Sequence, residues 1–520
     1  MSNSNFDFVI VGSGMGGLTV GSLLAKAGHR VCVLEAHEHP GGCAHSFPMG
    51  NFTFCAAVHY IFWCGEGEPI ANFLRKLDLQ DEVSFVRLDS EGYDLFSCPS
   101  AGIKFSIPNG LDKWALRLVD RYPQHRQKIL QFFQRITTLA QQLNGLPFRL
   151  SAANFARAVW NCPAVFQYRN WTLQKLFDRL DLPLELQALL ATQVGDLGLP
   201  PDQVSLISYA ALAANYGMGA YYPRNHFKQF IDAIVGIIEH SPGCRFENYA
   251  EVVKARVDGK RVVEVTTEDG RSFSGDRFIF NIDPQLFVKI VGKQHFPKPY
   301  LRRTYYDYSI GSLTIYLALK DIDLEAYGFG NWNVWHYPHL DVNRAYHDQV
   351  EKDDFSNPWL FISCPTLHSQ DHKNLVCPPN HHILELVTVA SYRHFQRLRS
   401  ADSRAYHRLK QSISNSILET LRTHYLPELS QHMVMKVAGT PTTNERFLWA
   451  PEGNIYGATL TPRNVNFGRL KFDTPLSNVF LTGATAEFPS VGATVSGASR
   501  LYTHLTGDMV NPARDMAGVW

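Results

Sequence analysis

The sequence predicts a mixed α/β fold on three observations. An apolar run, Phe8 to Val11, meets a glycine turn, and apolar residues then recur at helical spacing from Leu18 to Ala27. A second apolar run, Arg30 to Leu34, follows and ends at an acid. Near the other end of the chain, an apolar run over 477–482 is followed by a glycine and then by helical spacing over 489–505. Strand–helix–strand order predicts a parallel sheet with helices packed on it.

The glycine turn predicts a dinucleotide site. Residues 12–17 read Gly-Ser-Gly-Met-Gly-Gly, and Glu35 lies 18 residues beyond Gly17. In such a unit Gly12 permits the tight turn, Gly14 lets a pyrophosphate approach the backbone, and Gly17 lets the helix pack on the strand. The helix N-terminus offers free N–H groups to the phosphates, and the acid holds a ribose hydroxyl pair. This context predicts a Rossmann-like unit, not a bare glycine turn.

A second glycine pair indicates which dinucleotide binds. Pro40-Gly41-Gly42 lies just past the acid, where it is typical of FAD-binding units and not of NAD-binding ones. The sequence therefore predicts FAD as the cofactor. The residues expected around it in this half of the site are Gly12, Gly14, Gly16, Gly17, Glu35, Ala36, Gly41, Gly42 and Cys43.

Composition limits the other classes of function. A chain of 520 residues is too long for one compact core, so we expect two domains or one large two-lobed unit. A net charge of +1 gives no reason to expect a nucleic-acid partner. The nine cysteines are scattered without a Cys-x-x-Cys pair, so we expect no metal site and a reducing compartment. With no apolar run of spanning length and no secretory signal pattern, we expect a cytoplasmic protein that is soluble or peripheral on a membrane.

The middle of the chain alternates helical and strand patterns. Helical patterns cover 70–79, 112–143 with a break at Pro123, 226–239 and 403–424, and strand patterns cover 249–257, 261–268, 271–282, 311–319 and 382–389. Residues 321–380 carry no clear pattern. The block 151–200 interleaves aromatic and basic residues, and its part 151–180 has two interpretations. It is either an amphipathic cap helix with a solvated basic face or a peripheral membrane contact.

These residues resemble a known family. The opening unit, the Pro-Gly-Gly at 40–42 and the strand–glycine–helix at 478–505 resemble the FAD-dependent superfamily of phytoene desaturases, carotenoid isomerases and retinol saturases. Residues 41–47 and 59–61 look closest to the retinol saturase branch, with the carotenoid isomerases next. The resemblance covers the whole chain. It implies a FAD-binding domain of the two-dinucleotide-binding type, split over 1–95, 201–295 and 430–520, and an α+β substrate or cap domain formed by 96–200 and 296–429.

The resemblance also assigns roles at the second half of the site. It implies that Val252 meets the adenine and that a C-terminal group lies along the ribityl chain and flavin ring, namely Gly483, Ala484, Gly492, Ala493, Thr494 and Val495. Four segments depart from the family pattern, among them Cys55-Ala56-Ala57, where an acid is frequent, and Asn225-His226, where a glycine pair is usual. Cys43 replaces an Arg or Ser that is frequent after the second glycine pair, and Ala484 replaces a frequent Asp.

The same resemblance implies chemistry on a long apolar polyene or lipid of carotenoid or retinoid type, as a saturase or as a reduced-flavin isomerase. The catalytic candidates are His59 and Tyr60, because a His can donate a proton beside a flavin; a packed structural role is the alternative. A desaturase and an amine-oxidase-like flavoenzyme remain alternatives. So does a prenyl-lipid-binding escort protein of the same fold, against which the intact phosphate glycines and Glu35 argue.

Overall fold

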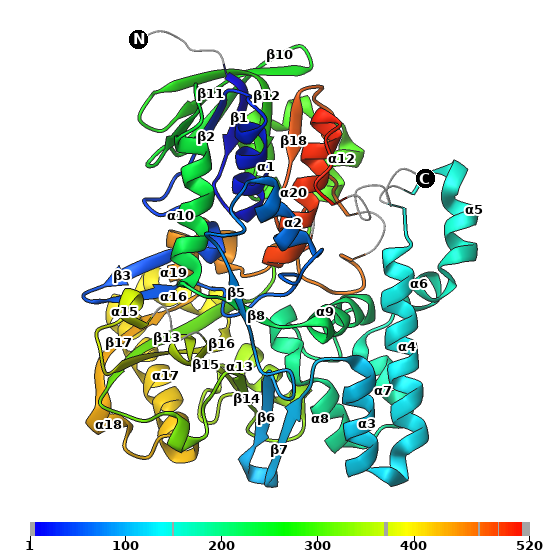
Figure 1. Cartoon of the computed structure of the whole chain (residues 1–520), viewed down its shortest axis with the longest axis vertical. Coiled ribbons are helices and arrows are strands. Elements are labelled where there is room, and N and C mark those ends of the chain that lie inside the picture. Colours follow the sequence, from blue (N-terminus) through cyan, green and yellow to red (C-terminus); the bar gives the residue numbers. More distant parts are fainter. Residues whose placement is uncertain (1–5, 148–149, 369–372, 466–468, 487, 512–520) are drawn as a thin grey trace.

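Two seven-stranded sheets, one above the other in Figure 1, organise the chain. The computed structural model describes residues 6–147, 150–368, 373–465, 469–486 and 488–511. The expected α/β class, with a Rossmann-like unit beside an α+β part, is confirmed.

The first sheet runs β10-β11-β12-β1-β2-β9, and β18 pairs with the free edge of β12. Its strands are β1 (Phe6–Val11), β2 (Val31–Leu34), β9 (Arg245–Glu247), β10 (Val252–Asp258), β11 (Arg261–Thr267), β12 (Ser272–Phe280) and β18 (Val479–Leu481). The strands β9, β2, β1, β12 and β18 are mutually parallel. Because parallel sheets are covered on both faces, β1 and β2 are almost entirely apolar and buried.

Helices cover this first sheet. In order they are α1 (Met15–Lys26), α2 (Pro69–Lys76), α10 (His226–Glu239), α11 (Pro284–Val291), α12 (Lys298–Thr304) and α20 (Val491–Thr506). Helix α1 contacts both α10 and α20. The predicted first helix, the three-stranded meander and the C-terminal strand–helix pair are all confirmed to within a few residues.

The second sheet runs β17-β13-β16-β15-β14-β6-β7. Its strands are β6 (Asp94–Cys98), β7 (Ile103–Ile107), β13 (Gly311–Lys320), β14 (Asn333–His336), β15 (Leu360–Ser363), β16 (His381–Ala390) and β17 (Met433–Gly439). Its pairs are antiparallel except β14 with β6. Strand β13 is buried from Gly311 to Leu319, which explains its largely apolar sequence.

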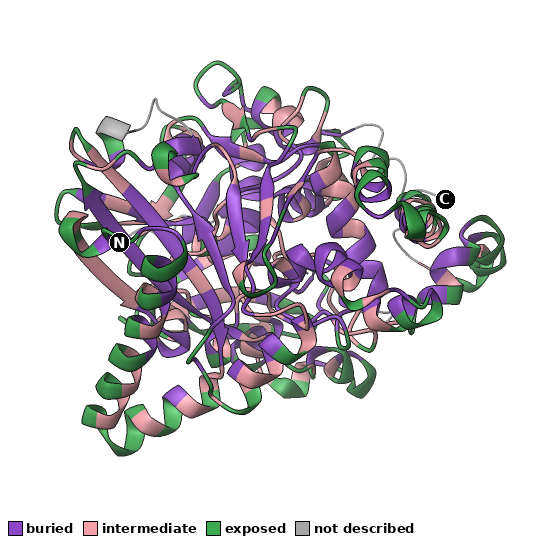
Figure 2. Cartoon of the chain, turned by 90° about the horizontal axis from the view of Figure 1, so that it is seen from below, coloured by how far each residue is buried: buried purple, intermediate pink, exposed green. Residues whose placement is uncertain are grey.

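Helices surround the second sheet. The right-hand layer of Figure 1 contains α3 (Leu111–Arg121), α4 (Arg126–Asn144), α5 (Ala152–Asn161), α6 (Pro163–Tyr168), α7 (Leu173–Arg179), α8 (Leu184–Leu190) and α9 (Leu206–Met218). The remaining helices are α13 (Val342–Glu351), α14 (Pro365–His368), α15 (Lys373–Val376), α16 (Tyr392–Ala401), α17 (Ser403–His424), α18 (Leu429–His432) and α19 (Pro441–Phe447). Pro123 separates α3 from α4, as the sequence predicts. Figure 2 shows buried strands inside and exposed helical turns outside.

Two small antiparallel strand pairs lie outside the two large sheets. Strand β3 (Ser46–Met49) pairs with β4 (Phe52–Cys55), and β5 (Phe85–Arg87) pairs with β8 (Tyr221–Pro223). Strand β17 falls inside the range 430–520 that the sequence assigns to the FAD-binding domain, yet it pairs with β13 in the second sheet. We therefore propose that the chain returns to the first sheet after Gly439. Within the described ranges, no helix is long and apolar enough to cross a bilayer.

Candidate cofactor site

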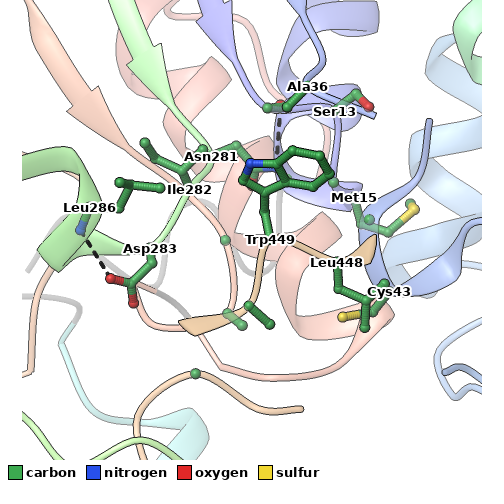
Figure 3. A pocket seen from close by; sticks show the side chains of 18 of the residues that line it. Ser13, Met15, Ala36, Cys43, Asn281, Ile282, Asp283, Leu286, Leu448 and Trp449 are labelled. Carbon is green, nitrogen blue, oxygen red and sulfur yellow. Dashed lines mark hydrogen bonds between the residues drawn. The ribbon is translucent and has the colours of Figure 1, made fainter. Parts of the chain in front are cut away.

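A cavity of about 540 Å³ lies where the parallel strands of the first sheet end (Figure 3). Residues that directly follow the carboxyl ends of β1, β2, β12 and β18 line it: Gly12, Glu35, Asn281 and Thr482. Ligands bind in this position in open α/β sheets, because the loops on either side diverge there.

The glycine turn forms one wall of this cavity. Gly12 has φ 95°, a left-handed conformation that an L side chain avoids. A Cβ on Gly17 would overlap the carbonyl oxygen of Gly12, so only glycine lets α1 approach β1 this closely. Gly14 is the N-cap of α1 and supplies no side-chain cap. The first N–H groups of α1 therefore face the cavity, as an incoming phosphate requires.

Asn281 packs against this turn from the end of β12. A Cβ on Gly14 would lie 2.7 Å from its Nδ2 atom, and one on Gly16 would lie 2.7 Å from its Oδ1 atom. The Asn281 N–H donates to the Val11 carbonyl oxygen at 2.8 Å, which joins the two strand ends. The sequence analysis missed Asn281. Its position at the end of an apolar strand was the available signal.

Glu35 occupies the position expected for a ribose-binding acid. Its Oε2 atom accepts from the Ser13 N–H at 2.8 Å and from the Ser13 hydroxyl, and its Oε1 atom accepts from the His37 N–H at 2.8 Å. Each carboxylate oxygen can accept more than one hydrogen bond. The side chain is half-buried and lines the cavity, as does Ala36. The residues present therefore fit a dinucleotide: free helix N–H groups for phosphate and a fixed carboxylate for ribose.

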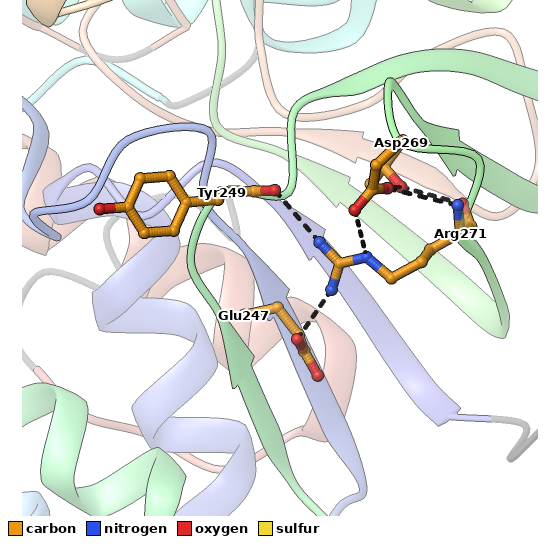
Figure 4. Close-up of polar contacts among 5 residues, drawn as sticks. Glu247, Tyr249, Asp269 and Arg271 are labelled. Carbon is orange, nitrogen blue, oxygen red and sulfur yellow. Dashed lines mark hydrogen bonds and ion pairs between the residues drawn. The ribbon is translucent and has the colours of Figure 1, made fainter.

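Arg271 stabilises the loop between β9 and β10, which leads to the cavity at Val252 (Figure 4). Arg271 lies 2.9 Å from a Glu247 oxygen and 2.7 Å from an Asp269 oxygen, and it donates to the Tyr249 carbonyl oxygen at 3.1 Å. These contacts fix the connection between β9 and β10. Val252, the predicted adenine contact, follows that connection and lines the cavity.

The C-terminal group divides between the cavity and the core. Gly483, with φ 106°, lines the cavity together with Ala484 and Thr494. The other three predicted residues do not line it. Gly492 packs against the Phe62 carbonyl oxygen, Val495 is fully buried in the core, and the Ala493 N–H donates to Ser490 Oγ at 3.0 Å.

The second glycine pair shapes the opposite end of the cavity. Gly41 and Gly42 both have positive φ, and a Cβ on Gly42 would lie 3.0 Å from the Gly14 Cα atom. Cys43 follows them and also lines the cavity. The Cys43 side chain is exposed to the open cavity, but the protein around it desolvates the thiol and raises its pKa to about 11, so this cysteine stays protonated at neutral pH.

The two catalytic candidates lie behind the cavity wall. Ala57 and Val58 line the cavity, but His59 and Tyr60 do not. His59 Nδ1 is 2.5 Å from an oxygen of Glu385, whose side chain is fully buried. Tyr60 contacts two acids instead: its hydroxyl oxygen is 3.0 Å from Asp94 Oδ2 and 2.6 Å from Asp196 Oδ2.

Sequence reasoning missed these three acids. Asp94 begins a strand, Asp196 lies in a short 3₁₀ helix (Thr192–Leu197) and Glu385 lies mid-strand. None belongs to a recognisable motif. Only the tertiary structure brings them to His59 and Tyr60.

Comparisons with known proteins agree with this geometry. The model of the NAD(P)-binding Rossmann-like domain matches residues 10–77. The all-trans-retinol 13,14-reductase of Danio rerio is 26% identical over 95% of this chain and 85% of its own length. The chloroplastic prolycopene isomerase of Arabidopsis thaliana is 23% identical over 94% of this chain and 80% of its own length.

A solved structure supports the fold independently. Putrescine oxidase bound to putrescine superposes with a TM-score of 0.66, at 13% identity, over 97% of this chain and 100% of that one. The whole-length matches agree with the resemblance drawn from residues 41–47 and 59–61. The chain is therefore an enzyme with the fold of the flavin-dependent oxidoreductases and a relative of the all-trans-retinol 13,14-reductases and the prolycopene isomerases.

Proposed function

We propose that this protein binds FAD and acts on a carbon–carbon double bond of a long apolar polyene or lipid, as a saturase or as a cis–trans isomerase. The observation that carries the proposal is similarity over almost the whole chain to enzymes named for all-trans-retinol and for prolycopene. Both named compounds are conjugated polyenes, so a shared polyene site is the simplest common requirement. FAD, when bound and reduced, would supply a hydride to such a substrate in the saturase reaction, and would be neither oxidised nor reduced overall in the isomerase reaction.

The chain's own residues would hold the cofactor. The first turn of α1 would bind the pyrophosphate, Glu35 the adenosine ribose and Val252 the adenine. The flavin ring would then lie toward the end lined by Cys43, Val58 and Tyr456. That end carries few charges, which suits an apolar substrate and keeps water from the reacting atoms.

One experiment tests the proposal and ranks its alternatives. The purified protein should be yellow, and a Glu35→Ala variant should retain less flavin at the same free FAD concentration. The reduced protein is then incubated anaerobically with all-trans and cis polyenes, and the products are analysed by mass and chromatographic retention. A gain of two hydrogens marks a saturase, unchanged mass with altered retention an isomerase, and a loss of two hydrogens a desaturase. A colourless protein that takes up no FAD contradicts the proposal.

We also propose a peripheral membrane contact through residues 151–180. Three apolar side chains of α5 are exposed, Phe155 by 47%, Val159 by 36% and Trp160 by 85%. A second open pocket, of about 660 Å³, is lined by Arg135, Lys175 and Arg179 together with Asp178, and also by Tyr168 of α6, the helix that follows α5. Exposed apolar side chains beside cations are typical of surfaces that bind anionic bilayers. A polyene substrate dissolves in lipid, so a membrane is where the enzyme would meet it.

A further inference from the structure

Tyr60 joins two buried aspartates that no sequence motif connects. Asp94, at the start of β6, is fully buried, and Asp196 lies in the 3₁₀ helix at 192–197. The Tyr60 hydroxyl oxygen lies within hydrogen-bond distance of one oxygen of each carboxyl group, at 3.0 Å and 2.6 Å. The Tyr60 ring is fixed because it stacks on Tyr216 at 4.5 Å and on Phe361 at 5.8 Å between ring centroids.

Counting hydrogens shows that this group holds an additional proton. A phenol has one hydrogen and can donate it to one carboxylate only. The second short contact requires a hydrogen on the other carboxyl group. Two ionised carboxylates on one hydroxyl, without a cation, would repel each other in a low-dielectric interior. Among the described residues, no ion pair or hydrogen bond brings a Lys, Arg or His to either aspartate.

The other hydrogen bonds decide which aspartate holds the proton. Asp94 accepts from Gln193 Nε2 at 2.7 Å and from Asn333 Nδ2 at 3.1 Å, and both donors stabilise its ionised form. Asp196, by contrast, has one hydrogen-bond partner among the described residues, which is Tyr60. Burial, followed by the Asp94 charge, raises the pKa of Asp196 well above its ordinary value. Above about pH 7, where Asp94 is ionised, the order of donation is therefore from the Asp196 carboxyl to the Tyr60 oxygen, and from the Tyr60 hydroxyl to Asp94.

Asp196 is also placed next to the proposed substrate end of the cavity. Tyr456 lines that end, and its hydroxyl donates to the carbonyl oxygen of Gly195, the residue before Asp196, at 3.1 Å. Asp196 does not line the 540 Å³ cavity itself, but it is only half-buried although protein surrounds it, so the residue borders an internal space behind Tyr456. The titratable groups around it are Asp94 and the tyrosines at 60, 93, 216, 337, 346 and 456.

We propose that Asp196 is the acid that delivers a proton to a carbon of the bound polyene, with Tyr60 and Asp94 as its positioning residues. This inference rests on the proposed function. The step breaks the O–H bond of Asp196 and forms a C–H bond from the electron pair of the double bond. In the saturase reaction the neighbouring carbon, left electron-poor, takes a hydride (one proton with two electrons) from the reduced cofactor. A proton from water then restores Asp196.

The first test does not require activity. Infrared spectra are recorded at about pH 8.5, above the value of about 7 to which burial raises the pKa of Asp94. We expect a protonated-carboxyl band that shifts in heavy water, persists in Asp94→Asn, moves in Tyr60→Phe and disappears in Asp196→Asn. The Asn retains an N–H that can donate to Tyr60, so the fold should survive. Absence of the band from the wild type, or its loss in Asp94→Asn alone, overturns the assignment.

The second test concerns transfer to the substrate. With a polyene that the wild type converts in a single anaerobic turnover, Asp196→Asn should be slower by about 100-fold or more, the usual contribution of a general acid. Asp120→Asn, on the exposed face of α3, is the control and should keep the wild-type rate. An Asp196→Asn variant within twofold of the wild type overturns the donor role. If the wild type converts no polyene, the proposed function fails, and the infrared band still decides where the proton resides.

Discussion

Two consecutive residues, His59 and Tyr60, each contact buried acids on the second sheet or beside it. His59 pairs with Glu385 of β16, and Tyr60 contacts Asp94 of β6. Burying a carboxyl group in an apolar core destabilises its ionised form unless partners compensate. These positions therefore have a measurable effect on how stability depends on pH.

We expect Asp94→Asn to change the pH dependence of stability. Burial raises the pKa of Asp94 from its ordinary value near 4 to about 7. Between these values the folded state binds more protons than the unfolded state, so this group's stabilisation is present at low pH and is lost as pH rises toward 7. From about pH 5 to 8, the variant should gain on the order of 2 kcal/mol relative to the wild type.

Melting temperatures of both proteins across this pH range measure the effect. Asp120→Asn serves as the exposed control, and its difference from the wild type should not vary with pH. If the melting temperatures of Asp94→Asn and the wild type changed in parallel over this pH range, Asp94 would be ionised in the folded protein throughout it, which would contradict the prediction.

At the scale of elements, the close approach of α1 to β1 sets where the N-terminus of α1 lies in the candidate cofactor site. The approach depends on Gly17, because the backbone of Gly12 occupies the space that a side chain would need. The contact is backbone against Cβ, so no side-chain rotation can relieve it. The helix would have to move, and its free N–H groups would move with it.

We expect Gly17→Ala to lower both stability and flavin content. Overpacking of this kind costs roughly 1–3 kcal/mol, and the shifted helix would misplace the phosphate-binding N–H groups. Gly236→Ala in α10 is the matched control, since its Cβ would meet no atom closer than 3.7 Å. That change should be neutral or slightly stabilising. The melting temperature and the flavin-to-protein ratio of both variants check the prediction, and equal flavin content would contradict it.

At the scale of the whole molecule, one cavity joins segments from nearly the full chain. Its lining includes Gly12, Glu35, Val252, Tyr456 and Gly483. A ligand that spans these segments binds the folded state and has no comparable site on the unfolded chain. Its binding energy is therefore added to the stability of the fold.

Removal of the flavin should accordingly lower the melting temperature. Titrating FAD back should raise the melting temperature again, because the free energy of unfolding increases with the logarithm of FAD concentration, by about 2.7 kcal/mol at a hundredfold excess over Kd. The Glu35→Ala variant should need more FAD for the same increase in melting temperature. NAD at the same concentration should increase the melting temperature of the wild type less than FAD does. A melting temperature that does not respond to FAD would contradict a dinucleotide in this cavity.

The membrane proposal is also a property of the whole molecule. Wild-type protein should co-sediment with anionic vesicles at low salt and less so at high salt, because salt screens exposed charges. A Phe155→Ser/Trp160→Ser double variant should bind several-fold less. Val434→Ser, an exposed apolar position on β17, is the control and should bind like the wild type. Equal sedimentation of all three proteins would contradict the contact.

The sequence by itself determined the α/β class, the first helix and the parallel strands, and it singled out several of the residues that line the cavity at their ends. Local patterns suffice there, because Gly12, Gly14 and Glu35 act within one strand–helix–strand unit. The partners of His59 and Tyr60 were decided only by tertiary structure. Glu385 is 326 residues from His59, and Asp196 is 136 residues from Tyr60. A buried acid carries no local pattern, since its position follows from how the second sheet and the helix layer pack together.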